Sequence, residues 1–267
     1  MWQIFVSSLI LSLLFLPFLA WRWRLNLKIA FLSAFIIGAL TGFIVSWLVS
    51  TSLKMNLAVI ILIEIIFILF LASAAILYRF YRDPERVPAE NNRVILSPAD
   101  GKIIYINPLA SGQPLISTKG RRSFRLDEII STDLLPDPAF LIGIDMNLLN
   151  VHINRSPIEG KIILQKHIPG QFISLRKPEA EILNERVSTV VDNGRFRIGV
   201  VQIASRLVRQ IVCYLKEGDT VYLGQRIGMI RLGSQVDIVI PNLDHLAINV
   251  QPGTPVLAGV TVIARYE

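Results

Sequence analysis

Three long apolar segments near the N-terminus constrain this chain more than any other feature. They cover residues 4–21, 27–49 and 56–78. Each approaches the roughly 20 residues that an α-helix needs to cross the hydrocarbon core of a bilayer. Because 52% of all residues are hydrophobic, the sequence predicts transmembrane helices over residues 1–78, followed by a separate domain over residues 79–267.

The charges that flank these segments predict their orientation. The flanking basic residues are Arg22, Arg24, Lys28, Lys54, Arg79, Arg82 and Arg86. All but Lys54 follow the first or the third segment, and cytoplasmic loops are enriched in Lys and Arg. The pattern predicts a multi-pass protein of the cell membrane, with its N-terminus outside and its large domain in the cytoplasm. The alternative for the first segment is a cleaved signal peptide, although no basic residue precedes its apolar run.

Glu64 lies in the middle of the third segment, where a charged side chain is costly. We favour the interpretation that it makes a polar contact with another helix. A functional carboxylate within the membrane is the alternative.

The rest of the chain is moderately basic. Four of the 27 basic and one of the 20 acidic residues precede residue 79, so residues 79–267 carry a formal charge of +4. This excess suits a domain on an anionic membrane surface better than a nucleic-acid-binding protein. The basic stretch 117–125 is either a lipid contact or a solvated loop. The single cysteine, Cys213, excludes an intramolecular disulfide and argues against most zinc sites, and we predict no metal.

After residue 78 the sequence changes to short β-rich segments that alternate with turns. We predict a mainly β domain of the β-sandwich or barrel-sandwich kind, with a short helix near residues 179–184 and no repeat of whole-domain scale. The stretch 212–230 resembles the hammerhead hairpins of biotinyl and lipoyl domains, but no lysine stands at a hairpin tip. The predicted strands cover residues 94–96, 102–106, 123–126, 140–144, 161–165, 189–191, 196–201, 211–214, 237–240 and 260–265.

Asp100, His152 and the pair Gly233-Ser234 are candidates for chemistry. Among three histidines, His152 is the natural candidate for a general base, because imidazole titrates near physiological pH. The alternatives are a hydrogen-bonded histidine at a strand edge and turn-forming roles for Asp100 and Gly233-Ser234. Ser234 also leads into an alternating run, residues 236–240, that predicts a half-buried strand.

Several motifs occur in order from about Tyr78 to the C-terminus, over roughly 70% of the chain. They read FYRDPERVPAENNRVILSPADGKI, VHINRSP, HIPGQF, NERV, VQIASRLVRQIVCYLKEGDTVYLGQRIGMIRLGSQVDIVIP and PVLAGVTVIA. Together they resemble the phosphatidylserine decarboxylase family, especially its short prokaryotic form. An ordered set of motifs is much more specific than any one of them.

The resemblance implies a precursor that cuts itself between Gly233 and Ser234. Ser234 would attack the carbonyl of Gly233, and elimination and hydrolysis would leave a pyruvoyl group, a covalent cofactor made from Ser234. The resemblance also implies a triad in which Asp100 orients His152 and His152 deprotonates Ser234. The pyruvoyl group would form a Schiff base with phosphatidylserine and release CO2, without a diffusible cofactor or metal. The partners would be the membrane lipid and the two chains of one precursor, paired as a heterodimer.

Some features depart from the family pattern or leave alternatives open. Leu149 stands where some members carry a second histidine, so the donor of the Cα proton is open, and His152 could serve twice. Another pyruvoyl-dependent lyase and a membrane-anchored lipoyl-like adaptor are the competing functions. Phosphate-binding candidates, Arg155 and Arg186, rest on charge alone, and a homo-oligomer is left open.

Overall fold

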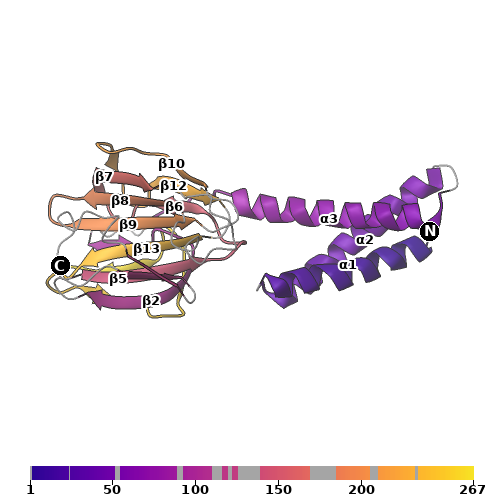
Figure 1. Ribbon diagram of the computed structural model, residues 1–267, viewed down its shortest axis with the longest axis horizontal. Helices are drawn as coiled ribbons and strands as arrows, with labels where there is room; N and C mark the ends of the chain where they lie inside the picture. Colours follow the sequence, from indigo (N-terminus) through magenta and orange to yellow (C-terminus); the bar gives the residue numbers. More distant parts are fainter. Residues whose placement is uncertain are drawn as a thin grey trace. The chain divides into compact units, whose positions relative to one another are not determined.

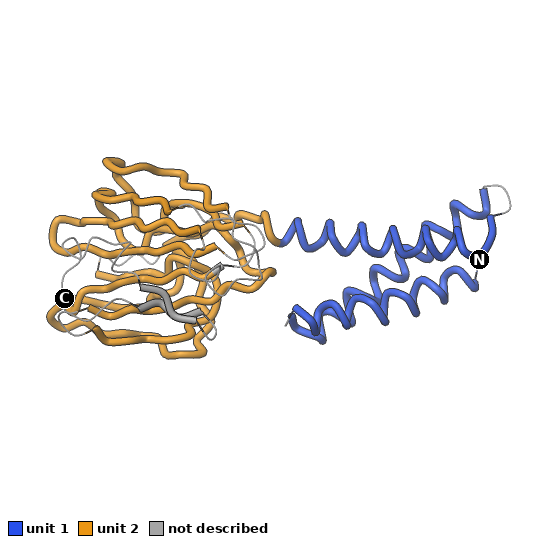
Figure 2. The backbone as a smooth tube through the Cα atoms, in the orientation of Figure 1, with its two compact units in different colours: residues 1–79 blue, residues 80–267 orange. Residues whose placement is uncertain are grey.

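The computed structural model separates into two compact units, residues 1–79 and residues 80–267 (Figure 2). For Ser234 it describes the backbone only, while Gly233 and the short helix predicted near residues 179–184 lie outside the described residues. The structure describes residues 2–23, 25–51, 55–88, 93–109, 116–119, 122–125, 139–168, 185–204, 210–231 and 234–267.

The first unit consists of apolar helices: α1 (Trp2–Arg22), α2 (Leu27–Thr51) and α3 (Leu57–Tyr81), whose last two residues belong to the second unit. All three are long and apolar enough to cross a membrane (Figure 1). The prediction of three such helices ahead of a β domain is therefore confirmed.

Small residues allow α1 and α2 to approach each other closely. A side chain on Gly38 would collide with Ser12, and one on Gly42 would meet Phe5. Small residues of this kind allow close backbone packing of helices that lack a hydrophobic driving force between them.

Glu64 is fully buried between helices of this unit. Its carboxylate accepts hydrogen bonds from the hydroxyls of Ser7 (2.6 Å) and Ser8 (3.0 Å) of α1. This is the helix-packing contact that the sequence predicted. The hydroxyl donors compensate one oxygen of a carboxylate that would be costly against lipid, and the other oxygen has no hydrogen-bond partner among the described residues.

The second unit is built mainly from antiparallel strands, as predicted. Its main sheet has the order β11-β7-β8-β9-β13-β5-β2-β15, and most of these strands can be followed in Figure 1. Two smaller sheets, β1-β16-β14 and β10-β12-β6, and the hairpin β3-β4 complete it. The strands are β1 (Val94–Leu96), β2 (Gly101–Leu109), β3 (Ile116–Lys119), β4 (Arg122–Arg125), β5 (Ala139–Met146), β6 (Ile153–Arg155), β7 (Gly160–Ile168), β8 (Arg186–Asp192), β9 (Arg197–Ala204), β10 (Gln210–Cys213), β11 (Thr220–Val221), β12 (Arg226–Arg231), β13 (Ser234–Pro241), β14 (Ala247–Ile248), β15 (Pro255–Val256) and β16 (Val262–Arg265).

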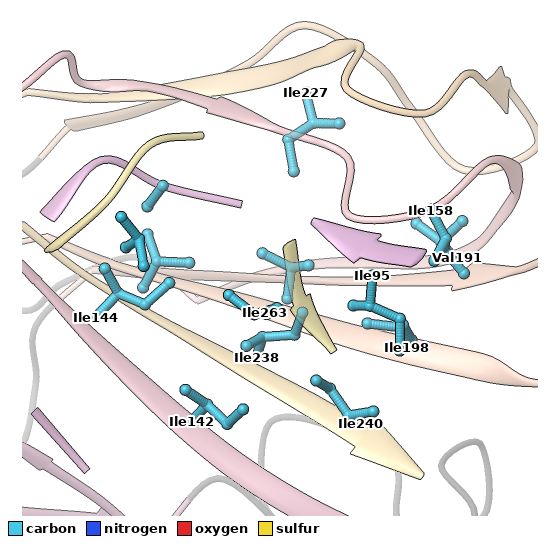
Figure 3. Packing of buried hydrophobic residues seen from close by; sticks show 14 of the residues in the cluster. Ile95, Ile142, Ile144, Ile158, Val191, Ile198, Ile227, Ile238, Ile240 and Ile263 are labelled. Atoms are coloured by element: carbon cyan, nitrogen blue, oxygen red, sulfur yellow. The ribbon is translucent and has the colours of Figure 1, made fainter. Parts of the chain in front are cut away.

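The core of this unit lies between the main sheet and the two smaller sheets. Isoleucines of the main sheet, such as Ile142 and Ile238, share one cluster with Ile95 of β1, Ile227 of β12 and Ile263 of β16 (Figure 3). Burial of these β-branched side chains fixes the smaller sheets on the main one. The loops that join the sheets are thereby held in place.

Strand β13 is a central strand of the main sheet. Its alternating sequence predicted a half-buried strand, and this prediction was wrong. The strand pairs with β5 on one side and β9 on the other, and residues 235–240 are buried on both faces. The polar residues on its second face are hydrogen-bonded within the protein: Tyr105 donates to Asp237 (2.9 Å), and Gln235 donates to Tyr105 (3.0 Å). A second hydrophobic cluster covers this face, so the polar alternation does not mark solvent.

Two short patterns each occur twice in this unit. The pattern Ser-Pro-x-x-Gly-Lys covers residues 97–102 and 156–161, and Gly-x-x-Val-x-x-Gly covers residues 218–224 and 253–259. Each copy of the first pattern pairs with a copy of the second, β2 with β15 and β7 with β11.

The two copies also bind each other reciprocally. Leu96 donates its N–H to the carbonyl of Pro157 (3.0 Å), and Arg155 donates its N–H to the carbonyl of Pro98 (2.9 Å). This internal repeat places Asp100 and Glu159 at equivalent positions.

Candidate active site

Asp100 differs from its repeat partner Glu159 in its surroundings. Asp100 is buried and Glu159 is exposed. The next residue, Gly101, has a φ of 156° and passes so close to the carbonyl of Asp145 that any side chain would collide with it. The turn thus fixes the backbone on which the Asp100 side chain is carried.

The carboxylate of Asp100 joins three segments of the chain. Arg86 donates to both of its oxygens (2.5 and 2.9 Å), which makes a two-pronged ion pair. The backbone N–H groups of Val151 (3.3 Å) and Ala258 (2.8 Å) complete the set. A buried carboxylate needs such compensation, because loss of its hydration is otherwise costly.

A tight turn leads from β5 to His152. The side chain of Asn150 accepts from the N–H of Asn147 (2.8 Å), and the side chain of Asn147 accepts from the N–H of Leu149 (2.9 Å). Short polar side chains commonly cap turns in this way. The turn orients the carbonyl of Asn150, which is the partner of the His152 ring.

The imidazole of His152 is fully buried, and its protonation pattern follows from its contacts. Nδ1 lies 2.9 Å from the carbonyl oxygen of Asn150. Since a carbonyl only accepts, Nδ1 carries the hydrogen, and Nε2 of the neutral ring is left with a free lone pair. Among the described residues, Nε2 has no hydrogen-bond partner although it is buried.

Burial lowers the pKa of His152 to about 4. The bond to Asn150 and the negative charge of Asp100 act in the opposite direction, and the positive charge of Arg82 adds to the lowering. The ring of Phe80 covers the imidazole at a centroid distance of 4.0 Å and an interplanar angle of 31°. At neutral pH the ring is therefore uncharged and able to accept a proton.

The backbone places His152 and Ser234 on neighbouring elements. The last residue of β5, Met146, pairs with Ser234, and the turn to His152 begins directly after it. On the other side, the carbonyl of His152 accepts from the N–H of Ile230 (3.2 Å), next to the end of β12. Only residues 232 and 233 separate β12 from Ser234.

Asp100 forms a hydrogen bond with the main chain next to His152 and not with the imidazole ring. Its carboxylate binds the N–H of Val151, the residue before His152, whereas the ring nitrogen Nδ1 binds the carbonyl of Asn150. Among the described hydrogen bonds, none joins the Asp100 carboxylate to the imidazole itself. The structure thus brings the two residues together, with Asn150 as the group that sets the ring orientation.

The arginines that charge alone had suggested for phosphate binding are buried. The guanidinium of Arg155 donates to the carbonyls of Gly224 (3.1 Å) and Pro84 (3.0 Å), and it lies 3.3 Å from the carboxylate of Asp83. These partners give Arg155 a role within the fold.

Three residues of this site were not singled out from the sequence: Phe80, Arg86 and Asn150. Phe80 and Arg86 lie inside the motif FYRDPER, but nothing in the motif indicates which of its charges meets Asp100. Asn150 contributes a backbone carbonyl, for which the sequence carries no signal.

The family model for phosphatidylserine decarboxylase matches residues 73–264. The chain belongs to the phosphatidylserine decarboxylase family. The predicted membership is confirmed, and with it the assignment to an enzyme family of carboxy-lyases and not to the membrane-anchored adaptors.

Two relatives show how far the similarity extends. A phosphatidylserine decarboxylase proenzyme of Chlorobium chlorochromatii is 35% identical over 237 residues, which cover 85% of this chain and the full length of the relative. A protein of Methanocaldococcus jannaschii, provisionally named archaetidylserine decarboxylase proenzyme, is 41% identical over 185 residues, 69% of this chain and 87% of the relative. Both names include the word proenzyme, which denotes a precursor.

Proposed function

We propose that this chain is the precursor of a pyruvoyl-dependent enzyme that converts phosphatidylserine into phosphatidylethanolamine and CO2. The observation that carries the proposal concerns Nε2 of His152. This nitrogen carries no hydrogen, is buried and has no hydrogen-bond partner among the described residues. A buried polar atom without a partner costs free energy and calls for an explanation. The hydroxyl of a serine on the adjacent β13 would satisfy it and would be activated by it.

In the proposed maturation, Nε2 of His152 takes the proton of the Ser234 hydroxyl. The hydroxyl oxygen of Ser234 then attacks the carbonyl carbon of Gly233. The C–N bond between the two residues breaks, the amine of Ser234 takes up a proton, and an ester remains. Loss of the Cα proton of Ser234 then expels the carboxylate of Gly233 and leaves dehydroalanine. One water hydrolyses the imine tautomer to ammonia and a pyruvoyl group.

Once formed, the pyruvoyl group would supply a keto carbonyl for the substrate amine and, next to it, an amide carbonyl that could take up the electron pair left by CO2. The neighbouring residues fit such a group. The missing side chain of Gly233 lets the hydroxyl approach the peptide carbonyl, and Asp100 holds the main chain before His152. Because Leu149 stands where a second histidine could have been, we assign the return of a proton to the substrate Cα to His152 as well.

We infer that the two chains stay together after cleavage. The smaller chain, residues 234–267, would begin with β13, which lies between β5 and β9 of the larger chain. The many ladder hydrogen bonds and the buried faces of β13 would have to be lost before the chains could separate. A heterodimer is the expected mature form.

The helices α1 to α3 would hold the catalytic domain at the membrane that contains its substrate. We propose that this domain is cytoplasmic, because basic residues cluster at the C-terminal ends of α1 and α3 and the domain follows α3. An enzyme tethered to its substrate's bilayer need not extract the lipid into water.

A second candidate differs in the lipid and not in the reaction. The two relatives are named for different lipids that share the serine headgroup. The test uses the purified, detergent-solubilised full chain and vesicles of phosphatidylcholine doped with carboxyl-labelled phosphatidylserine or archaetidylserine. Labelled CO2 from the first lipid supports the proposal, and release from the second alone would replace phosphatidylserine as the substrate. No release from either would contradict the proposed reaction.

A further inference from the structure

The segment from Phe80 to Arg86, termed the connecting segment, contacts the candidate active site at both of its ends. It belongs to the second unit, as do both of the side chains that it contacts there. The ring of its first residue lies against the ring of His152, and its last residue pairs with Asp100. The turn directly before His152 contacts the same two side chains, through the Asn150 carbonyl and the Val151 N–H.

Arg86 closes a ring of hydrogen bonds with Asp100 and Ala258. Its guanidinium donates to the carbonyl of Ala258 (2.7 Å), and the N–H of Ala258 donates to the carboxylate that Arg86 also binds. The side chains of Arg86 and Asp100 are 9% and 2% exposed. Without Arg86, the negative charge of Asp100 would be buried with backbone donors alone, and removal of one partner from a buried pair is strongly destabilising.

Phe80 belongs to a small apolar cluster around the histidine, with Val151, Ile153 and Met229. These residues precede and follow His152 in the chain or lie on the neighbouring β12. Phe80 therefore both excludes water from the imidazole and restricts the rotation of its plane.

The middle of the connecting segment forms ion pairs of its own, which do not involve Asp100 or His152. Asp83 lies 3.3 Å from the guanidinium of Arg155 and 2.6 Å from that of Arg226, and Glu85 lies 2.6 Å from Arg226. These attachments leave the backbone between Phe80 and Arg86 little freedom, so the two ends are placed together.

We propose that the connecting segment is part of the self-cleavage site, with Arg86 and Phe80 as positioning residues that hold Asp100 and His152 in the arrangement required for attack on Gly233. The inference rests on the proposed function and adds residues to it. It also means that the catalytic domain needs the residues directly after α3 in order to mature.

The first test follows self-cleavage of the full chain made by cell-free synthesis in the presence of lipid nanodiscs. We expect Arg86→Met to slow cleavage by about 10- to 100-fold, because small displacements of reacting groups cost factors of this size. Arg86→Lys, which keeps the charge and one contact, should cleave at an intermediate rate. The control Arg197→Met removes another arginine–aspartate pair, with Asp192 at the end of β8, and should cleave at the unaltered rate.

A double-variant cycle tests whether Arg86 acts through Asp100. If it does, Arg86→Met/Asp100→Asn cleaves no more slowly than the slower of the two single variants. Rates that multiply, or equal rates for Arg86→Met and Arg86→Lys, would overturn the positioning role. Thermal unfolding of the same variants, each with Ser234→Ala to prevent cleavage, separates loss of rate from loss of folded protein.

The second test uses the pH profile of cleavage. In Phe80→Leu water reaches the imidazole, so the pH at which cleavage is half-maximal should rise from near 4 toward 6.5. Asp100 and Arg82 are the charged groups that act on this ring, and neither is changed. The control Phe196→Leu removes a buried ring that packs on Tyr266 and should leave the profile unchanged. An unaltered profile in Phe80→Leu would overturn the role of Phe80.

The experiments distinguish failure of the proposed function from failure of the inference about the connecting segment. If the unaltered chain and Arg197→Met are never cut, the proposed function fails. If both are cut and Arg86→Met is cut equally fast, only the inference about the connecting segment fails.

Discussion

At the level of single residues, the proposed role of His152 as a general base rests on two contacts. The carbonyl of Asn150 fixes which nitrogen carries the hydrogen, and the buried position under Phe80 keeps the ring neutral. Together they leave an unprotonated Nε2 at neutral pH, which is what a general base for a serine hydroxyl requires. Asp100 acts on His152 indirectly, because its carboxylate binds the backbone N–H of Val151, the preceding residue.

The lowered pKa of His152 predicts a specific pH dependence of stability. The folded chain resists protonation of this ring down to about pH 4, whereas the unfolded chain binds the proton near pH 6.5. Stability should therefore fall as the pH drops from 6.5 to 4, by up to about 3 kcal/mol, and recover as the pH rises. Thermal unfolding of Ser234→Ala between pH 7 and 4 measures this, with Ser234→Ala/His152→Gln as the reference. A constant difference between the two across this range would contradict the assignment.

The internal repeat supplies a matched pair of variants for Asp100. Asp100→Asn loses the charge that pairs with Arg86 and should slow self-cleavage by about tenfold or more. Glu159→Gln changes the equivalent, exposed residue and should cleave at the unaltered rate. Denaturing gels of a synthesis time course give both rates, and equal slowing in the two variants would mean that burial of Asp100 is irrelevant to the reaction.

At the level of elements, the sequence predicts where strands occur better than what surrounds them. Runs of β-branched residues marked most strands of the main sheet, whereas β6, with the sequence INR, contains no such run and was not predicted. The burial of β13 was predicted wrongly, because Asp237 and Gln235 form hydrogen bonds with Tyr105 of β2, two places away in the sheet. Contacts of this kind depend on which strands become neighbours, and alternation along one strand does not encode that choice.

The same limit applies to the candidate site. The motifs pointed to Asp100, His152 and Ser234, but they do not indicate that Asp100 binds Arg86, 14 residues before it, and Ala258, 158 residues after it. A motif records residue types in order, whereas a hydrogen-bond network depends on the completed fold.

The turn that carries Asp100 gives a prediction at the same scale. Gly101→Ala would force a methyl group against the carbonyl of Asp145 and should lower the free energy of unfolding by about 2–4 kcal/mol. Gly194→Ala is the control, because that glycine has a φ of 83° but open space around it, and it should cost about 1 kcal/mol. Denaturant titration in the Ser234→Ala background compares the two, and similar costs would contradict the close approach.

At the level of the whole molecule, three apolar helices precede a catalytic domain of the phosphatidylserine decarboxylase family. We expect the helices to provide attachment to the membrane and the β domain to provide the chemistry. The connecting segment belongs to the unit that contains the β domain. We expect the helices to be exchangeable for another membrane anchor, provided that residues 80–86 are kept.

The flanking charges predict the topology of this assembly. A reporter that is active only in the cytoplasm should be active when fused after Glu267, and one that is active only outside should be active when placed between Ser50 and Lys54. Activity of the two reporters in the opposite pattern would show that the positive charges after α1 and α3 do not face the cytoplasm.

The central claim is that the chain cuts itself before Ser234 and converts this residue into its cofactor. Mass spectrometry of the purified, active protein under denaturing conditions tests it most directly. The account predicts two chains, residues 1–233 and 234–267, the smaller one with a pyruvoyl group in place of its amino terminus and therefore resistant to Edman degradation, while Ser234→Ala stays whole and inactive. A single intact chain of 30.0 kDa in an active preparation would contradict it.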